Sequence, residues 1–303
     1  MKALKQPRNY SKKMNKRVHR IPYLGYHTRA YVLGDLNKGI PLIILHGGPG
    51  GCVERYEPLE KLADDGIPLI FYDQLGCGYS KVPKNHKIDW NFRVFLDEFE
   101  NLIKYFKLKK YNVLGHSWGG MLALEYVTNF EHKGLQKLIL FSTLPSTKIW
   151  NEEHDKIFDE FSPKEKAALL AQKNGEEYDK NEYKKAVKKF VKNHVGKRSK
   201  DLYPFKTKRF PKTNREIYEK MWGKSEFYGT GTLVDWNVES KLHTIDVPTL
   251  IISGAFDEST PAMNELMNKE IKNSTWVLLK KSHHIGYVEE TDLVLKSIKD
   301  FIL

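Results

Sequence analysis

Short apolar runs alternate with segments of helical periodicity through the first half of the chain and again near its C-terminal end. Apolar runs that predict strands lie at 29–33, 41–45, 68–72, 111–114, 135–141, 248–253 and 276–279. Apolar positions at helical spacing predict helices at about 54–63, 89–106, 118–130, 262–271 and 293–302. We expect 29–33 to be an edge strand. The alternation predicts an α/β fold, namely a doubly wound and mostly parallel sheet with functional residues at the carboxyl ends of its strands.

The alternation stops at about residue 144 and resumes at about residue 242. Between these points the chain has charged segments of helical character and no apolar run typical of a buried strand. We therefore expect three parts: a first core part at 1–143 that includes a basic N-terminal arm, a helical cap at 144–241, and a second core part at 242–303. A core interrupted by a cap suits a chain of 303 residues.

A sharp turn is predicted where the run at 111–114 meets the following helix. The residues at this turn are Gly115, His116, Ser117, Trp118 and Gly119. A serine in G-x-S-x-G between a strand and a helix is the pattern of a nucleophile elbow, in which the glycines leave room for the tight backbone. We expect the Ser117 hydroxyl to lie at the edge of the sheet, near the positive end of the helix. His116 should point to the opposite face, which makes it a poor candidate for the base.

A second glycine-rich segment, HGGPGG at 46–51, follows the run at 41–45. Glycines after a strand allow backbone amides to approach a ligand closely. The segment fits neither G-x-G-x-x-G nor G-x-x-x-x-G-K-[ST], so a nucleotide-binding loop is disfavoured. We expect the amides of Gly48 and Trp118 to form an oxyanion hole, in which one donor can contribute ~3 kcal/mol of transition-state stabilisation.

An acid and a histidine follow two later strands. Asp257 comes after the run at 248–253, and His284 comes after the run at 276–279. Singly, such residues are more often a helix cap and a surface histidine. Together with Ser117 they have the order serine, acid, histidine and lie at strand ends, which favours a catalytic triad. His284 would then accept the Ser117 proton while Asp257 orients the imidazole.

The composition favours a globular protein of the cytoplasm. The chain is 40% apolar and 12% aromatic, which is enough to bury a large core. No apolar run approaches the ~20 residues of a membrane span, and the basic N-terminus lacks the apolar centre of a signal peptide. Two cysteines, Cys52 and Cys77, form no disulfide framework and suit a reducing compartment.

The net charge of +12 raises the alternative of a nucleic-acid partner. The lysines and arginines concentrate in two clusters, at 2–20 and 184–215. Neither cluster contains a zinc-finger, RNP-type or basic-zipper pattern. We therefore expect solvated basic faces that attract acidic partners nonspecifically, with no specific nucleic-acid binding and no membrane binding.

Six sequence blocks occur in the order typical of a known family. They are HGGPGG (46–51), FYDQLGCGYS (71–80), GHSWGG (115–120), MWGKSEF (221–227), GTLVDW (231–236) and GAFDESTP (254–261). From about Gly39 onward the chain resembles the proline iminopeptidases (prolyl aminopeptidases) of the α/β-hydrolase superfamily, and it is similar to the tricorn-interacting aminopeptidase. The resemblance implies the same triad and no metal or other cofactor. It also implies a serine aminopeptidase that releases N-terminal proline, or another apolar residue, from short peptides with a free N-terminus through an acyl-enzyme.

Two acidic residues gain a role only through this resemblance, which implies that Glu226 and Glu258 hold the free α-amino group of the substrate. A buried ammonium needs carboxylate partners to offset its lost hydration. Without the resemblance, each acid would be interpreted as solvated. Three aromatic residues are candidates for the wall of a pocket for the proline ring, although such residues more often belong to the core. They are Trp118, Phe227 and Tyr228.

Two points stay open in the sequence. The block SHHIGYVEE has adjacent histidines, His283 and His284, where the family usually has one. Counting back from Glu289 selects His284 and counting from the preceding serine selects His283, and we favour His284. The alternative functions are a carboxylesterase or lactonase on the same fold, or a non-catalytic hydrolase-fold protein that binds acidic partners.

Overall fold

The computed structural model describes residues 16–196 and 210–303 of the chain. Most of the basic arm predicted at the N-terminus, and the part of the second basic cluster at 197–209, lie outside these ranges. No helix within the two ranges is both long enough and apolar enough to cross a bilayer.

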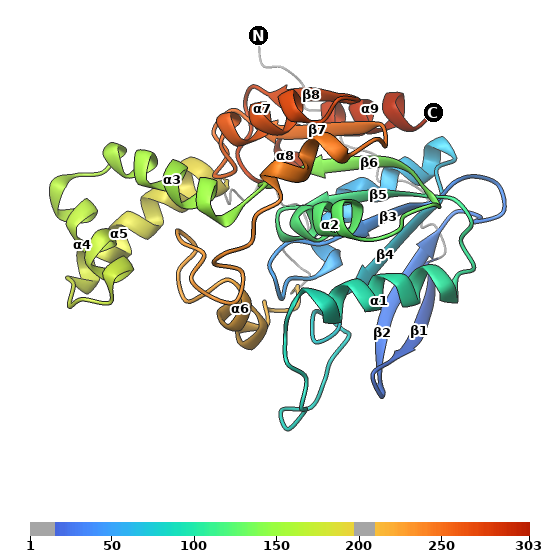
Figure 1. Cartoon of the computed structure of the whole chain (residues 1–303), viewed down its shortest axis with the longest axis horizontal. Coiled ribbons are helices and arrows are strands. Elements are labelled where there is room, and N and C mark those ends of the chain that lie inside the picture. Colours follow the sequence, from blue (N-terminus) through green and yellow to red (C-terminus); the bar gives the residue numbers. More distant parts are fainter. Residues whose placement is uncertain (1–15, 197–209) are drawn as a thin grey trace, which may run out of the picture.

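One eight-stranded sheet forms the centre of the molecule (Figure 1). Its strands are β1 (Arg17–Tyr23), β2 (Tyr26–Leu33), β3 (Leu42–Leu45), β4 (Leu69–Asp73), β5 (Tyr111–His116), β6 (Leu135–Phe141), β7 (Thr249–Gly254) and β8 (Ser274–Leu279). They lie in the order β1-β2-β4-β3-β5-β6-β7-β8. The pairs β1·β2 and β2·β4 are antiparallel, and the other five pairs are parallel. The crossovers between parallel strands are the doubly wound pattern that the alternation of runs predicted.

The prediction that 29–33 is an edge strand is wrong. This run forms most of β2, whose outer side is covered by β1, with Arg17 opposite Val32 and Tyr23 opposite Tyr26. Strand β1 was not predicted, because four of its seven residues are exposed and its sequence therefore contains no apolar run. Its edge position and basic side chains are typical of a protected sheet edge.

Helices cover both faces of the sheet (Figure 1). On one face lie α1 (Phe92–Tyr105), α2 (Trp118–Asn129) and α7 (Pro261–Glu270). On the other face lie η1 (Val53–Asp65), α8 (Gly286–Glu289) and α9 (Thr291–Ile302). In β3, Ile43 and Leu45 pack on the first face while Leu42 and Ile44 pack on the second. A strand buried on both faces explains why its sequence is a continuous apolar run.

Two predicted helices differ in their limits or type. The segment predicted at 54–63 is a 3₁₀ helix, η1, with Pro58 inside it and a break in helical geometry at Tyr56. The helix predicted from residue 89 begins at Phe92, because the Asn91 side chain accepts a hydrogen bond from the Val94 amide and caps the helix there.

Helices without a sheet strand occupy the described chain between β6 and β7, where the sequence predicts a cap. They are α3 (Thr147–Ile157), η2 (Phe158–Glu160), α4 (Pro163–Asn174), α5 (Lys180–Phe190), η3 (Val191–Val195), α6 (Arg215–Met221) and η4 (Glu239–Thr244). Phe158, Phe190 and Phe227 belong to a small apolar cluster of their own in this part. Helices α4 and α5 project beyond the sheet (Figure 1).

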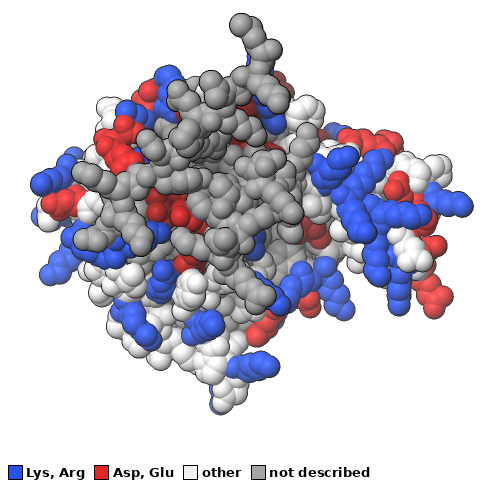
Figure 2. Space-filling model, turned by 180° about the vertical axis from the view of Figure 1, so that it is seen from behind, with Lys and Arg blue, Asp and Glu red and all other residues white. Residues whose placement is uncertain are grey.

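Lysine and arginine side chains gather over this projecting part (Figure 2). Helix α5 carries five lysines on its solvent side, while Ala186 and Phe190 face the small apolar cluster. One of these lysines, Lys185, pairs with Glu182. The arrangement is that of an amphipathic helix with a solvated basic face.

Candidate active site

Ser117 lies at a sharp turn between β5 and α2. Its φ of 54° is in the left-handed region that non-glycine residues rarely adopt. A side chain at Gly115 would collide with the backbone of Gly119, and one at Gly119 would collide with the backbone of Leu45. The two glycines therefore permit both the turn and the close approach of β3. The glycines of the G-x-S-x-G motif are thus required by the tight backbone of the elbow.

Asp257 and His284 meet at the carboxyl ends of β7 and β8. The Nδ1 atom of His284 lies 2.8 Å from Oδ1 of Asp257. Asp257 is held in turn by the amides of Ser259 and Gly254, which donate to its carboxylate at 2.8 and 3.3 Å. His283 has a different partner, because its Nδ1 atom lies 2.9 Å from Oε1 of Glu289. Of the two adjacent histidines, the structure thus joins His284 to Asp257.

A cavity of about 470 Å³ brings most of the predicted site residues together. It is lined by Gly48, Ser117, Glu226, Glu258 and His284 from the predicted set. Asp257 lies behind His284 and is 2% exposed. Trp118 is the first residue of α2, so its amide belongs to the elbow. These residues come from four strand ends and from the segment after α6, and they meet at one rim of the sheet.

The glycine-rich loop after β3 packs directly on the elbow. A Cβ atom at Gly47 would lie 3.1 Å from Cβ of Ser117. The amide of Gln74, after β4, donates to Nε2 of His46 at 3.1 Å, and the Gln74 side chain accepts a 2.9 Å hydrogen bond from the Trp118 indole. Gln74 therefore ties the loop that contains Gly48 to the start of α2.

Two carboxylates flank the His284 imidazole. Its Nε2 atom lies 3.4 Å from Oε1 of Glu258, opposite the Asp257 contact. Burial alone would lower the pKa of His284, but the negative charges of Glu258 and Asp257 raise it to about 9. Burial raises the pKa of Glu258, with the nearby Glu226 and Asp257 acting in the same direction, while the positive charge of His284 lowers it. The two carboxylates therefore stabilise the charged form of the imidazole.

Both acids named by the family resemblance face this cavity. Glu226 follows α6, and its Oε2 atom accepts a 2.7 Å hydrogen bond from the Tyr218 hydroxyl. The Trp222 indole donates to the Glu226 carbonyl at 3.2 Å and fixes the backbone there. Oε2 of Glu258 is buried and has no hydrogen-bond partner in the described part of the chain. A buried carboxylate oxygen without a donor is costly, which suggests that a ligand supplies one.

The apolar wall of the cavity differs from the prediction. Phe227 lines it, but Trp118 and Tyr228 do not. The Trp118 indole is buried beneath the elbow, where it bonds to Gln74, and the Tyr228 hydroxyl donates to Asp155 at 2.6 Å inside the cap. Sequence reasoning missed the wall from α5 and η3, which consists of Tyr183, Val187, Phe190, Val191 and Val195. Their helical spacing gave no sign that this face borders the site.

One backbone group of the cap touches the triad segments. The carbonyl oxygen of His194 accepts hydrogen bonds from the amides of Glu258 and His284, each at 3.2 Å. His194 therefore helps to fix the backbone of two cavity residues. No sequence motif could indicate this, because any residue has a carbonyl group.

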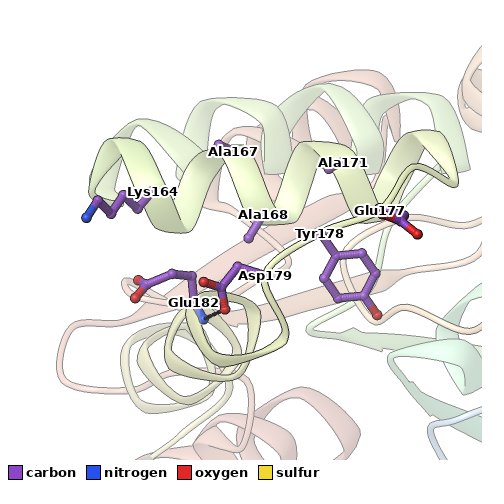
Figure 3. Close-up of a pocket in the computed structure, with 8 residues that line it drawn as sticks. All are labelled: Lys164, Ala167, Ala168, Ala171, Glu177, Tyr178, Asp179 and Glu182. Carbon is purple, nitrogen blue, oxygen red and sulfur yellow. Dashed lines mark hydrogen bonds between the residues drawn. The ribbon is translucent and has the colours of Figure 1, made fainter.

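A second hollow lies on the cap between α4 and α5 (Figure 3). It has a floor of alanines and a rim of acids, and it holds no serine, cysteine or histidine. Two of its three acids have local structural partners: Asp179 caps α5 through the amides of Asn181 and Glu182, and Glu182 pairs with Lys185. This hollow is not a candidate active site.

Comparison with known proteins identifies the family and the fold of this chain. The family model described as alpha/beta hydrolase fold matches residues 40–291. The chain is 35% identical to the proline iminopeptidase of Clostridioides difficile (strain 630) over 283 residues, covering 93% of this chain and 96% of that protein. It is 34% identical to the proline iminopeptidase of Lactobacillus helveticus (strain DPC 4571) over 284 residues, with the same coverage. Among solved structures, the proline iminopeptidase of Mycobacterium smegmatis superimposes with a TM-score of 0.81 at 26% identity, covering 95% of this chain and 97% of that one. The predicted α/β-hydrolase fold is confirmed.

Proposed function

The chain belongs to the proline iminopeptidase family of α/β-hydrolases, and from this premise we propose that it is a serine aminopeptidase that releases N-terminal proline, or another apolar residue, from short peptides. The observation that carries the proposal is the 2.8 Å contact between His284 and Asp257 at a cavity that also holds Ser117 and two carboxylates. A plain esterase has no use for paired acids beside its base. The acids favour a substrate with a positive charge next to the scissile carbonyl.

The reaction follows the usual course for a serine triad. Ser117 attacks the carbonyl carbon of the first residue while His284 takes the hydroxyl proton, and Asp257 stabilises the imidazolium that forms. The amides of Gly48 and Trp118 hold the negative oxygen. His284 then gives its proton to the leaving amine, and a water molecule, activated by the same imidazole, hydrolyses the acyl-enzyme.

Glu226 and Glu258 bind the α-ammonium group of the substrate in this scheme. The unpartnered Oε2 atom of Glu258 supports the assignment, because an ammonium would supply the missing donor. An ammonium at Glu258 would also compete with the His284 imidazole, which lies 3.4 Å from the same carboxylate. Since a second cation lowers the pKa of His284, substrate binding would free the imidazole to act as a base.

The cap supplies the apolar side of the site. Phe190, Phe227 and Val187 line the cavity and suit a proline ring or another apolar side chain. We propose that the cap acts as a lid that admits short peptides with a free N-terminus. The proposed location is the cytoplasm, which suits the two buried free thiols, Cys52 and Cys77.

A substrate panel tests the proposal. The purified protein should hydrolyse prolyl-anilide at least about 100-fold faster than N-acetylprolyl-anilide, since blocking the amine removes a charge pair worth about 3 kcal/mol or more. It should also prefer prolyl-anilide to an uncharged aryl ester after correction for the intrinsic reactivity of the ester. A preference for the ester would indicate a carboxylesterase instead. No turnover together with no labelling by a fluorophosphonate would indicate a non-catalytic protein.

A further inference from the structure

Two side chains outside the triad form a continuous hydrogen-bonded chain across the site. Tyr56 belongs to η1, and His116 is the residue before Ser117. The Gly47 amide lies 2.7 Å from the Tyr56 hydroxyl oxygen. That oxygen lies 2.9 Å from Nδ1 of His116, and Nε2 of His116 lies 2.9 Å from the carbonyl oxygen of His284. The chain thus joins the glycine-rich loop, the elbow and the segment of the base.

The groups at the two ends determine where every proton in the chain lies. The Gly47 amide can only donate, so the Tyr56 oxygen accepts from it, and the Tyr56 hydroxyl donates to Nδ1 of His116. The carbonyl of His284 can only accept, so Nε2 of His116 carries the proton and donates to it. One neutral tautomer of His116 satisfies all three hydrogen bonds. Burial, together with the nearby positive charge of His284, lowers the pKa of His116 to about 3, so this neutral form persists at working pH.

The surrounding packing leaves His116 little freedom to move. Its ring is edge-on to Phe141 and Tyr287 and lies 4.7 Å from the His284 ring, measured between centroids. A Cβ atom at Gly47 would lie only 3.1 Å from Nδ1 of His116. Both Tyr56 and His116 are buried, at 2% and 4% exposure. A well-packed polar chain with every member satisfied is rigid and specifies one arrangement of the segments that it joins.

We propose that Tyr56 and His116 are positioning residues, which set the placement of the oxyanion loop and of the His284 segment relative to Ser117. This inference rests on the proposed roles of Ser117, His284 and Gly48, but it does not depend on which substrate the enzyme takes. Both side chains line the cavity, and their polar atoms bond to Gly47, to each other and to the His284 carbonyl. They act through Gly47, whose next neighbour Gly48 supplies an oxyanion donor, and through the backbone that carries the imidazole.

Four variants separate a positioning role from general support of the fold. His116→Ala removes the chain, whereas His116→Gln keeps an N–H donor for the His284 carbonyl. Tyr56→Phe removes only the hydroxyl that joins Gly47 to His116. Tyr111→Phe is the matched control, because it also deletes a buried hydroxyl, one that bonds to the Tyr126 hydroxyl at 2.8 Å near the opposite end of β5.

The first measurement is the rate at which an uncharged fluorophosphonate labels Ser117, which requires no knowledge of the substrate. A misplacement of about 1 Å can lower the rate of a reaction about 100-fold, so we expect labelling to fall about 30- to 100-fold in His116→Ala and about 10-fold in Tyr56→Phe. His116→Gln should stay within about threefold of the parent, as should Tyr111→Phe. On prolyl-anilide, kcat should fall in parallel while KM and inhibition by free proline change less than about twofold.

Thermal unfolding checks that each variant is folded at the assay temperature. The proposal is overturned if folded His116→Ala and Tyr56→Phe label at the parent rate. It is also overturned if His116→Gln is as slow as His116→Ala, or if Tyr111→Phe slows labelling as much as Tyr56→Phe. If the parent protein labels at Ser117 but does not cleave prolyl-anilide, the proposed substrate is wrong while the labelling series still tests the positioning role.

Discussion

The rim of the sheet and the helical cap contribute to the same cavity in different ways. The rim holds its residues through buried hydrogen bonds between strand ends, as in the contacts of Asp257 with His284 and of Gln74 with Trp118. The cap contributes apolar side chains and Glu226, and it projects from the sheet on a small core of its own (Figure 1). From this difference we expect the rim to perform the proposed reaction and the cap to select the substrate. Changes at the rim should therefore lower kcat for every substrate, while changes in the cap should alter the ranking of substrates.

Replacing Ser117 by Ala is the strongest test of the rim. Without the hydroxyl no acyl-enzyme can form, so kcat should fall by about 10⁴-fold or more for every substrate of the panel. Thermal unfolding should change little, because the substitution removes a single hydroxyl group that lines the cavity. Measurable hydrolysis of prolyl-anilide at the parent rate would assign the reaction to another group. Fluorophosphonate labelling of the same variant should be absent.

Glu258 belongs to the rim but is expected to act in substrate selection as well. Replacing it by Gln therefore tests whether one rim residue can serve both roles. On prolyl-anilide, kcat/KM should fall about 100-fold, because the ammonium loses a buried partner. Labelling by an uncharged fluorophosphonate should instead become faster at pH 7. Glu258 and Asp257 together raise the pKa of His284 against the effect of burial, and only the neutral imidazole can accept the Ser117 proton. Removing the charge lowers this pKa, and each unit of decrease gives about tenfold more neutral imidazole at pH 7.

The pH dependence of the labelling rate shows whether Glu258 raises or lowers the pKa of His284. In the parent protein, labelling should rise with pH towards about 9, because the charged imidazole loses its proton there. In Glu258→Gln the rise should occur at lower pH. Glu226→Gln is the matched control, since it removes the other carboxylate of the proposed clamp, whose effect on the pKa of His284 is the smaller one. An unchanged profile in Glu258→Gln would show that Glu258 does not control the base.

Phe227 tests the selective role of the cap. Its ring packs edge-on against Phe190 and Phe158, with centroids 4.7 and 5.5 Å away, and it lines the cavity. Phe227→Leu should leave an apolar but differently shaped wall. We expect the ratio of kcat/KM for prolyl-anilide over leucyl-anilide to fall about tenfold, the usual scale for a change of this size in an apolar pocket. Fluorophosphonate labelling should be unaffected, and an equal loss on both anilides would contradict a selective role.

The sequence predicted the rim far better than the cap, for a physical reason. A buried parallel strand is a continuous apolar run, and catalytic side chains at its end stand beside glycines that the tight backbone requires, as at Gly115 and Gly119. Cap residues carry no such mark, because an α5 side chain that borders the cavity has the same helical spacing as one in any amphipathic helix. Thus, of the three aromatic candidates for the pocket wall, Trp118 and Tyr228 do not line the cavity, and the α5 wall was missed. The His194 carbonyl contacts depend on tertiary packing alone.

The smallest effect is expected from replacing Tyr218, a residue of α6 beside the proposed ammonium site. The Tyr218 hydroxyl donates to Oε2 of Glu226 at 2.7 Å, so Tyr218→Phe frees this carboxylate to move without removing its charge. A single hydrogen bond that water can replace contributes little, and we expect KM for prolyl-anilide to rise about threefold with kcat unchanged. Labelling by the uncharged fluorophosphonate should stay at the parent rate, since the Tyr218 hydroxyl bonds to Glu226 rather than to Asp257 or His284. A fall in kcat with KM unchanged would mean that α6 supports the reacting groups, and the division between a reactive rim and a selective cap would then fail at this point.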